Sequence, residues 1–303
     1  MKPQKLSSIF ILMLVVAACE REININPSTG FTGDIFIEGI LYPGEFPRVF
    51  ISRSPGFFEP DATPQELFGR GAVVTITGSM GQEILAADST FDKFRCRWVP
   101  FYAGNTPAIY GEAYDLTVIY QGKSYSASTT INQPKPIIDT VEYVGEFFDI
   151  YGGHDGVIIT FTDSPGSGDF YRYQMNRMID RNTHHVDVLE VIVNDCVAEG
   201  ELFRVTDLGR SVFNDENVDG LKLQLFIEVA FEYVKGDSAW VFLQSLDKNA
   251  ATFYRELDEQ LLARYNPFVE PVFIKSKIGD AIGVFGSAVR SDSILLIYPV
   301  SAD

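Results

Sequence analysis

Short runs of β-branched and aromatic residues recur along the chain and limit its fold more than any other feature. From residue 34 to 131 they follow one another at roughly ten-residue spacing, separated by polar or glycine-containing segments. The runs are IFIEGIL, RVFIS, AVVTIT, EILAA, FRCRWV, AYDLTVIY and KSYSAST. Short strands at regular spacing are typical of a β-sandwich. We therefore predict an N-terminal β-sandwich over residues 34–131.

The last two runs of this region carry turn signals. Gln121 and Gly122 separate Leu116–Tyr120 from Lys123–Ala127, which predicts a two-residue hairpin turn because glycine readily adopts positive φ. The preceding GEAYDL segment is similar to the tyrosine corner of immunoglobulin-like and fibronectin-like sandwiches, with Tyr114 as its tyrosine. This sandwich is therefore predicted to be of that class.

The second half of the chain repeats the strand pattern after a proline-containing connector, Asn132–Pro136. Its runs are TVEYV, GVIITFT, FYRYQMNRMI, VDVLEVIV, LKLQLFIEVAFEYV, SAWVFLQSL and SILLIYP. About 285 residues after a leader are more than one core usually organises. We predict a mainly β protein of two immunoglobulin/fibronectin-like sandwich domains, the second a β-rich domain over residues 137–303.

One segment of the second half has helical periodicity instead. Its apolar residues are Ala250, Phe253, Tyr254, Leu257, Leu261 and Tyr265. That spacing predicts an amphipathic helix over residues 248–265. Asp247 is expected to be its N-cap, and Asn266–Pro267 is expected to end it, because proline disfavours helical geometry in the residue before it.

The N-terminus has the features of an export signal. Lys2 and Lys5 precede the apolar run Ile9–Ala18, which is shorter than the about 20 residues that a membrane-spanning helix needs. Val16-Ala17-Ala18-Cys19 resembles a bacterial lipoprotein box. We predict a lipoprotein signal peptide over residues 1–18, lipidation of Cys19, and a flexible tether over residues 19–33. The alternative is an unlipidated secreted protein cleaved near Ala18.

The charge of the chain argues against a nucleic-acid partner. It has 24 Lys and Arg against 41 Asp and Glu, a formal net charge of −17, with no basic cluster. Phosphate backbones bind clustered basic side chains. The remaining cysteines, Cys96 and Cys196, lie in different halves of the chain, so we expect separately buried thiols, with a disulfide as the alternative.

Several segments together resemble the lipoprotein family called domain of unknown function 4249. They are the Val16–Cys19 box, Ile35–Leu41, the corner at Gly111–Leu116, the late helix and the block Asn266–Gly286, which ends in GVFG. The resemblance implies a lipoprotein in the outer membrane of Gram-negative bacteria, commonly encoded beside TonB-dependent receptors and without an established activity. Glu20 and Glu22 resemble signals that send such lipoproteins to the cell surface.

The usual sequence motifs of enzymes are absent. The histidines are His154, His184 and His185, and no GxSxG, HExxH, CxxC, GxxxxGK or GxGxxG motif occurs. We therefore predict no enzymatic activity and no cofactor apart from calcium.

Calcium is suggested by one loop. Asp215, Asn217 and Asp219, followed by Gly220, match the first half of a calcium-binding loop, in which alternate oxygens converge on the ion. Phe226 occupies the position at which an EF-hand has its bidentate glutamate. The alternative is an ordinary exposed turn.

Aromatic residues in two expected loops are candidate contacts with a ligand or partner. They are Phe57, Phe58, Trp98, Phe101, Tyr102 and Tyr110. Aromatic side chains on such loops often bind sugars, peptides or proteins, although they can also cover the end of a sandwich. We predict a surface lipoprotein that is a non-enzymatic binding or accessory component of a TonB-dependent receptor uptake system. The alternatives are a surface hydrolase with an unrecognised carboxylate pair, or an adhesion or structural protein.

Overall fold

The structure is a computed structural model and is mainly β. It describes residues 33–56, 62–93, 95–149, 152–166, 168–180, 196, 202–208, 212–228, 238–265, 270 and 272–298. The predicted signal peptide, Cys19 and nearly all of the tether lie outside this set. Neither of the helices in the described part has the length and hydropathy that crossing a membrane requires.

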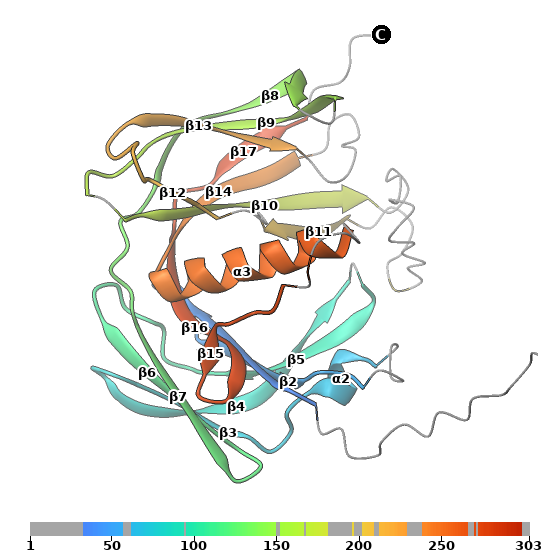
Figure 1. Cartoon of the computed structure of the whole chain (residues 1–303), viewed down its shortest axis with the longest axis vertical. Helices are drawn as coiled ribbons and strands as arrows, with labels where there is room; N and C mark the ends of the chain where they lie inside the picture. Colours follow the sequence, from blue (N-terminus) through green and yellow to red (C-terminus); the bar gives the residue numbers. More distant parts are fainter. Residues whose placement is uncertain are drawn as a thin grey trace, which may run out of the picture. The chain divides into compact units, whose positions relative to one another are not determined.

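The strands of the first half form one antiparallel succession in a large sheet (Figure 1). In pairing order they are β1 (Ile35–Leu41), β2 (Arg48–Arg53), β5 (Arg97–Ala103), β4 (Gly81–Asp92), β3 (Val73–Gly78), β6 (Ala113–Tyr120) and β7 (Lys123–Thr130). A four-residue helix, α2 (Pro64–Leu67), lies between β2 and β3, and Thr63 and Glu66 form its capping box. The curled sheet buries apolar side chains such as Val74, Leu116 and Val118 in a shared core.

Both local predictions for this half are confirmed. Gln121 and Gly122 have φ of 51° and 76° and join β6 to β7 as a two-residue turn. Tyr114 makes the predicted corner, because its hydroxyl accepts a hydrogen bond from the Ile109 N–H at 2.7 Å. Both features involve residues that lie close together in the sequence.

The large sheet continues across the predicted domain boundary. β16 (Ala281–Arg290) pairs in parallel with β1, so that Gly283 lies opposite Ile37. β15 (Lys277–Ile278) pairs with β16, and Phe285 of β16 contributes to the core of the first half. The division into two separate immunoglobulin-like domains is therefore not confirmed and stays a prediction.

Gly283 is required by this parallel pairing. Its φ is +147°, and a β-carbon on it would lie 1.8 Å from the backbone oxygen of Ile37. Only a residue without a side chain permits so close an approach of the two strands. Gly283 begins the GVFG segment, so the motif has a structural role at the junction of the two halves.

A second sheet has three strands and packs on the part of the large sheet formed after β7. Its strands, in pairing order, are β13 (Lys222–Glu228), β9 (Gly152–Thr162) and β8 (Ile137–Asp149). The facing strands of the large sheet are β10 (Phe170–Asp180), β14 (Ser238–Leu246) and β17 (Ile294–Ile297), and β11 (Leu202–Leu208) and β12 (Phe213–Asn214) pair with β10. Ile159, Met175 and Leu243 belong to the core between them.

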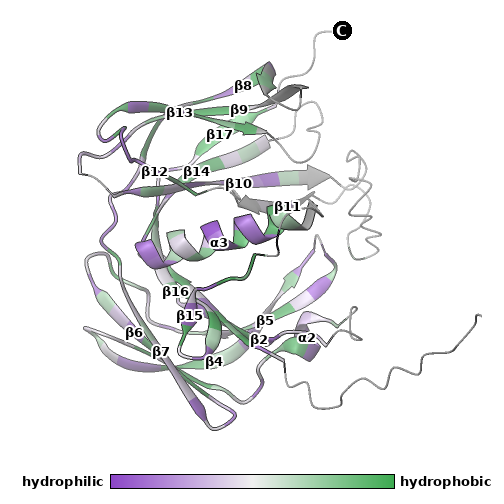
Figure 2. Cartoon of the chain, viewed as in Figure 1, coloured by the Kyte–Doolittle hydropathy of each residue, from purple (hydrophilic) through white to green (hydrophobic). Residues whose placement is uncertain are grey.

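The helix α3 (Lys248–Tyr265) has the predicted bounds and lies against β16, β14 and β10 (Figure 1). Hydrophobic and hydrophilic residues alternate along it, as expected for an amphipathic helix (Figure 2). Ala250 and Ala251 are fully buried against the sheet. Gly286 allows this approach, since a β-carbon there would lie 2.7 Å from the Asp247 carboxylate.

Asp247 is the N-cap of α3, as predicted. Its carboxylate accepts hydrogen bonds from the Ala250 N–H at 2.8 Å and from the Thr129 hydroxyl at 2.6 Å. Thr129 lies in β7, and its hydroxyl oxygen also lies 3.1 Å from the Ser287 hydroxyl oxygen of β16. The cap therefore connects the helix to strands from both halves of the chain.

Substitution of Asp247 separates its capping role from its charge. Asp247→Ala is expected to lower the free energy of unfolding by about 2 kcal/mol, because the N-cap acceptor is lost. Asp247→Asn retains an acceptor for Ala250, and its amide can donate to Thr129. Burial raises the pKa of the Asp247 carboxyl, against the opposing effect of the hydrogen bond from Thr129.

A raised pKa in the folded state gives stability that is complete below the unfolded pKa, about 3.9, and is lost as the pH rises through the folded value. The free energy of unfolding of Asp247→Asn should therefore equal that of wild type near pH 4 and exceed it increasingly toward pH 7. Urea unfolding at both pH values measures this difference. An Asp247→Asn variant as unstable as Asp247→Ala at pH 7 would contradict the account.

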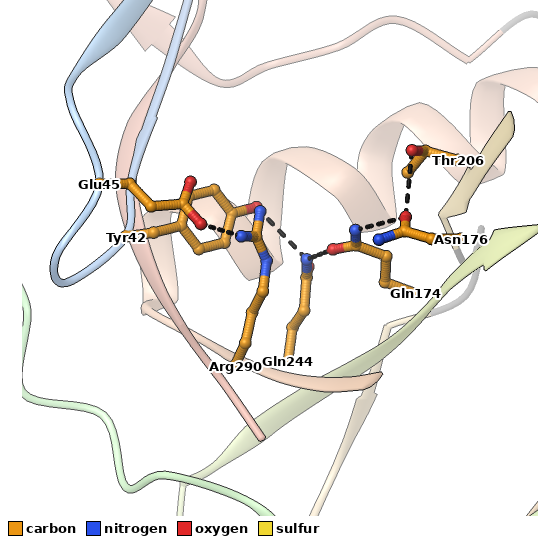
Figure 3. Close-up of polar contacts among 7 residues, drawn as sticks. All are labelled: Tyr42, Glu45, Gln174, Asn176, Thr206, Gln244 and Arg290. Atoms are coloured by element: carbon orange, nitrogen blue, oxygen red, sulfur yellow. Dashed lines mark hydrogen bonds and ion pairs between the residues drawn. The ribbon is translucent and has the colours of Figure 1, made fainter. Parts of the chain in front are cut away.

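A polar network connects the sheet face beneath α3 with the loop after β1 (Figure 3). Gln244 of β14 is fully buried and donates to the Gln174 side-chain oxygen at 2.6 Å and to the Tyr42 hydroxyl at 3.4 Å. The Asn176 side-chain oxygen accepts hydrogen bonds from the Gln174 amide and from the Thr206 hydroxyl. The Arg290 guanidinium stacks 3.7 Å from the Tyr42 ring centroid and pairs with Glu45. The network therefore connects five neighbouring segments, and its buried members, Gln174 and Gln244, are hydrogen-bonded to each other.

A buried arginine holds α3 onto the same face. Arg172 is 2 % exposed, donates to Gln244 at 3.0 Å, and lies 3.8 Å from the centre of the Tyr254 ring. The Tyr254 hydroxyl donates to Glu38 of β1 at 2.8 Å. A cation over an aromatic face in a desolvated position contributes about 2 kcal/mol, so the packing of the helix is polar as well as apolar.

Candidate functional site

The six predicted aromatic contact residues are placed differently in the structure. Trp98 and Tyr110 are 50 % and 54 % exposed, so both have a face available for a partner. Phe57 and Phe58 lie outside the described residues.

Phe101 and Tyr102 are not surface contacts. Each is only 3 % exposed, because residues 97–103 form the strand β5 and not the expected loop. The Tyr102 hydroxyl donates to the Gly69 carbonyl at 2.8 Å and accepts from the Ala72 N–H at 3.0 Å. Burial raises the pKa of Tyr102. These two residues belong to the core, and the prediction of contact was wrong for them.

Trp98 lies in a hairpin tip, which we define as the described residues of 91–98, from the end of β4 to the start of β5. Trp98 is opposite Phe91 in the strand register, and their rings meet edge to face with centroids 5.3 Å apart. An edge-to-face pair contributes about 1 kcal/mol beyond its buried area. The pair therefore holds the exposed indole in a defined position at the surface.

A disulfide between Cys96 and Cys196 joins the hairpin tip to a distant part of the chain. Their Cα atoms are 5.8 Å apart, and 100 residues separate them in sequence. Cys196 is exposed and Cys96 is partly exposed, so the expectation of two separately buried thiols was wrong. Sequence distance gave no indication of pairing because the fold, and not the spacing, brings the two residues together.

The predicted calcium residues Asp215 and Asp219 lie in a carboxylate cluster with a third residue, Asp163. One carboxylate oxygen from each lies within 4.8 Å of the others. Asp163 follows β9, and the pairing of β9 with β13 brings it to the turn at residues 215–220. Sequence reasoning missed Asp163 because about fifty residues separate it from this turn. Asn217 occupies a left-handed position in the turn, with φ of 73°.

Backbone amides hold the three carboxylates in place. The Gly220 N–H donates to Asp163, the Gly168 N–H to Asp215 and the Gly166 N–H to Asp219, at 2.8–2.9 Å. Asp163 and Asp215 are each only 2 % exposed. The Tyr171 hydroxyl donates to Asp163 at 2.6 Å. Burial and hydrogen bonding to Asp163 raise the pKa of Tyr171, so it remains a donor.

The carboxylates also affect Asp169, which sequence reasoning did not identify. Burial raises the pKa of Asp169 to about 6, the Tyr171 hydroxyl opposes this, and the charges of Asp163, Asp215 and Asp219 raise it further. Like charges held this close disfavour complete ionisation. The charges of the three carboxylates therefore add to the effect of burial on Asp169.

The spacing of these carboxylates can be compared with the spacing that calcium binding and glycoside hydrolysis require. Two oxygens bound to one Ca²⁺ can be at most about 5 Å apart, which the cluster satisfies. Glycoside hydrolases separate their carboxyls by about 5–5.5 Å or 6.5–9.5 Å and keep both accessible to the sugar. The buried acids therefore give no support to the predicted hydrolase alternative. Calcium binding stays a prediction, and a calcium-dependent rise in Tm in wild type but not in Asp219→Asn would test it.

Comparison with known proteins identifies a family. The model of the family described as Domain of unknown function (DUF4249) matches residues 20–293. The search of curated proteins found no match to the chain.

Proposed function

The chain belongs to the family Domain of unknown function (DUF4249), and from this premise we propose that it is a lipid-anchored surface protein that acts by contact. In this proposal lipidated Cys19 attaches it to the outer membrane, and the folded part serves as a non-enzymatic accessory of a TonB-dependent receptor in nutrient uptake. The observation that carries the proposal is the hairpin tip, where exposed Trp98 is braced by a disulfide.

The disulfide supports a location outside the cytosol. Disulfides form and persist in oxidising compartments and are rare where thiols are kept reduced. The leader ending at Cys19 is an independent feature of the sequence with the same implication. Two unrelated features therefore support export.

The hairpin tip has the properties of a contact surface for a protein partner. Tryptophan is enriched among the residues that dominate protein interfaces, and half of the Trp98 side chain is exposed. A surface that is already ordered loses less conformational entropy on binding. Trp98 is held in place by packing against Phe91 and by the disulfide at Cys96, two residues before it.

A pull-down from solubilised outer membranes tests this function. We expect wild type to recover a receptor barrel. Trp98→Ala should bind the barrel with at least about tenfold lower affinity, because it lacks an anchoring aromatic residue. Trp240→Ala is a matched control, because Trp240 is also a partly exposed strand residue, 41 % exposed, but lies in β14, outside the hairpin tip. Reproducible absence of a barrel with wild type, or equal recovery by Trp98→Ala, would overturn the proposal.

A further inference from the structure

A pocket lies where the first turns of α3 meet β7 and the β15–β16 hairpin. Its volume is about 270 Å³, and residues of all four elements line it. None of the predicted site residues contributes to it. It therefore offers a binding place that is separate from both the hairpin tip and the carboxylate cluster.

The inner lining of the pocket is apolar and buried. Ile278, Val284 and Phe285 line it and are no more than 3 % exposed. Gly283, also in the lining, has a backbone position fixed by its close approach to Ile37. A floor of this kind accepts an apolar group with little rearrangement.

Several polar groups around the pocket already have partners within the protein. The Ser276 hydroxyl donates to Glu256 at 2.8 Å, and the Ser128 hydroxyl donates to Asp115. The Asn249 side-chain amide donates to the backbone oxygens of Ser128 and Phe285. These groups form part of the pocket wall, and their donors already make hydrogen bonds within the protein.

The ammonium groups of Lys248 and Lys277 are different. Both residues line the pocket, and within the described part of the chain neither ammonium has an ion pair. By contrast, Lys123, Lys135 and Lys222 each lie within 4.0 Å of an aspartate oxygen. In a chain with a net charge of −17, these two lysines are therefore available to pair with an anionic group of a ligand.

The size of the pocket limits the ligand. Ligand pockets for drug-sized molecules have volumes of about 300–1,000 Å³, so this pocket is at or below the lower limit. We propose that it binds a small organic monocarboxylate, with its carboxylate between the Lys248 and Lys277 ammonium groups and a short apolar body against the inner lining. This inference is independent of membrane attachment and of any receptor.

Fluorine-observed NMR on the full lipidated protein in phosphatidylcholine nanodiscs tests the inference. The probes are 4-fluorophenylacetate and its neutral isostere 4-fluorophenylacetamide. In low salt, wild type should bind the carboxylate at least tenfold more tightly than the amide. Lys248→Met/Lys277→Met should reduce that ratio to near one, because methionine keeps an unbranched side chain without the charge.

Two further variants make the result specific. Lys222→Met removes an exposed lysine elsewhere and should leave the ratio unchanged. Thr252→Phe places a bulky side chain at the pocket lining. It should weaken binding of 4-fluorophenylacetate at least tenfold while Tm changes little. Equal affinity for acid and amide in wild type, no binding of either, or an unchanged ratio in the double variant would overturn the inference. None of these outcomes bears on recovery of a receptor barrel.

Discussion

Gly283→Ala is expected to lower the free energy of unfolding by about 4 kcal/mol or more, enough to prevent folding of a marginally stable chain. A β-carbon at this position would lie 1.8 Å from the Ile37 oxygen and 2.8 Å from its carbonyl carbon. Both are backbone atoms of β1, so relief requires that two paired strands separate. The φ of +147° adds the strain of a conformation that alanine rarely adopts.

Gly44→Ala is the matched control for backbone strain alone. Gly44 has a φ of +80°, but nothing lies within 4 Å of a β-carbon built on it. That substitution should cost about 1–2 kcal/mol, the penalty of a left-handed conformation for a residue with a side chain. Urea unfolding followed by far-UV circular dichroism measures both variants. Equal losses would mean that β1 and β16 do not approach as described.

Removal of the disulfide is expected to have an effect of similar size. Cys96→Ser/Cys196→Ser should lower the free energy of unfolding by about 4–5 kcal/mol, because a link closing a loop of this length restricts the unfolded chain strongly. The bridge also joins the hairpin tip to residue 196. Loss of the bridge should therefore increase protease cleavage at the tip as well as lower stability.

The double serine variant provides its own control for this experiment. Reductant should move the urea midpoint of wild type toward that of the variant and should leave the variant unchanged. Mass spectrometry of tryptic peptides without reduction should show residues 96 and 196 in one linked species. Identical urea midpoints for oxidised and reduced wild type would contradict the claim that the bridge stabilises the fold.

Features set by neighbouring residues could be predicted from the sequence. The turn at Gln121–Gly122 depends on the positive φ of two adjacent residues, and the Tyr114 corner depends on a backbone N–H five positions earlier. The bounds of α3 follow from its apolar periodicity and from Asp247 as its cap. In each case the decisive contacts lie within a few residues.

Features made by distant segments could not be predicted in the same way. Pairing of β1 with β16 joins strands about 240 residues apart, and no local pattern in Ile35–Leu41 indicates a parallel partner. Asp163 joins the carboxylate cluster only because β9 pairs with β13. The FRCRWV run indicated a strand, but not that the strand continues through Phe101 and Tyr102 or that both of its faces are covered there.

The most direct test of the account is the attachment of lipid at Cys19. Cells expressing wild type or Cys19→Ala are labelled with radioactive palmitate, and their membranes are separated from soluble periplasmic contents. The account predicts label in wild type in the outer-membrane fraction, and an unlabelled Cys19→Ala variant released from it. Unlabelled wild type, or a Cys19→Ala variant that stays with the outer membrane, would contradict the claim that the protein works as a lipid-tethered surface protein.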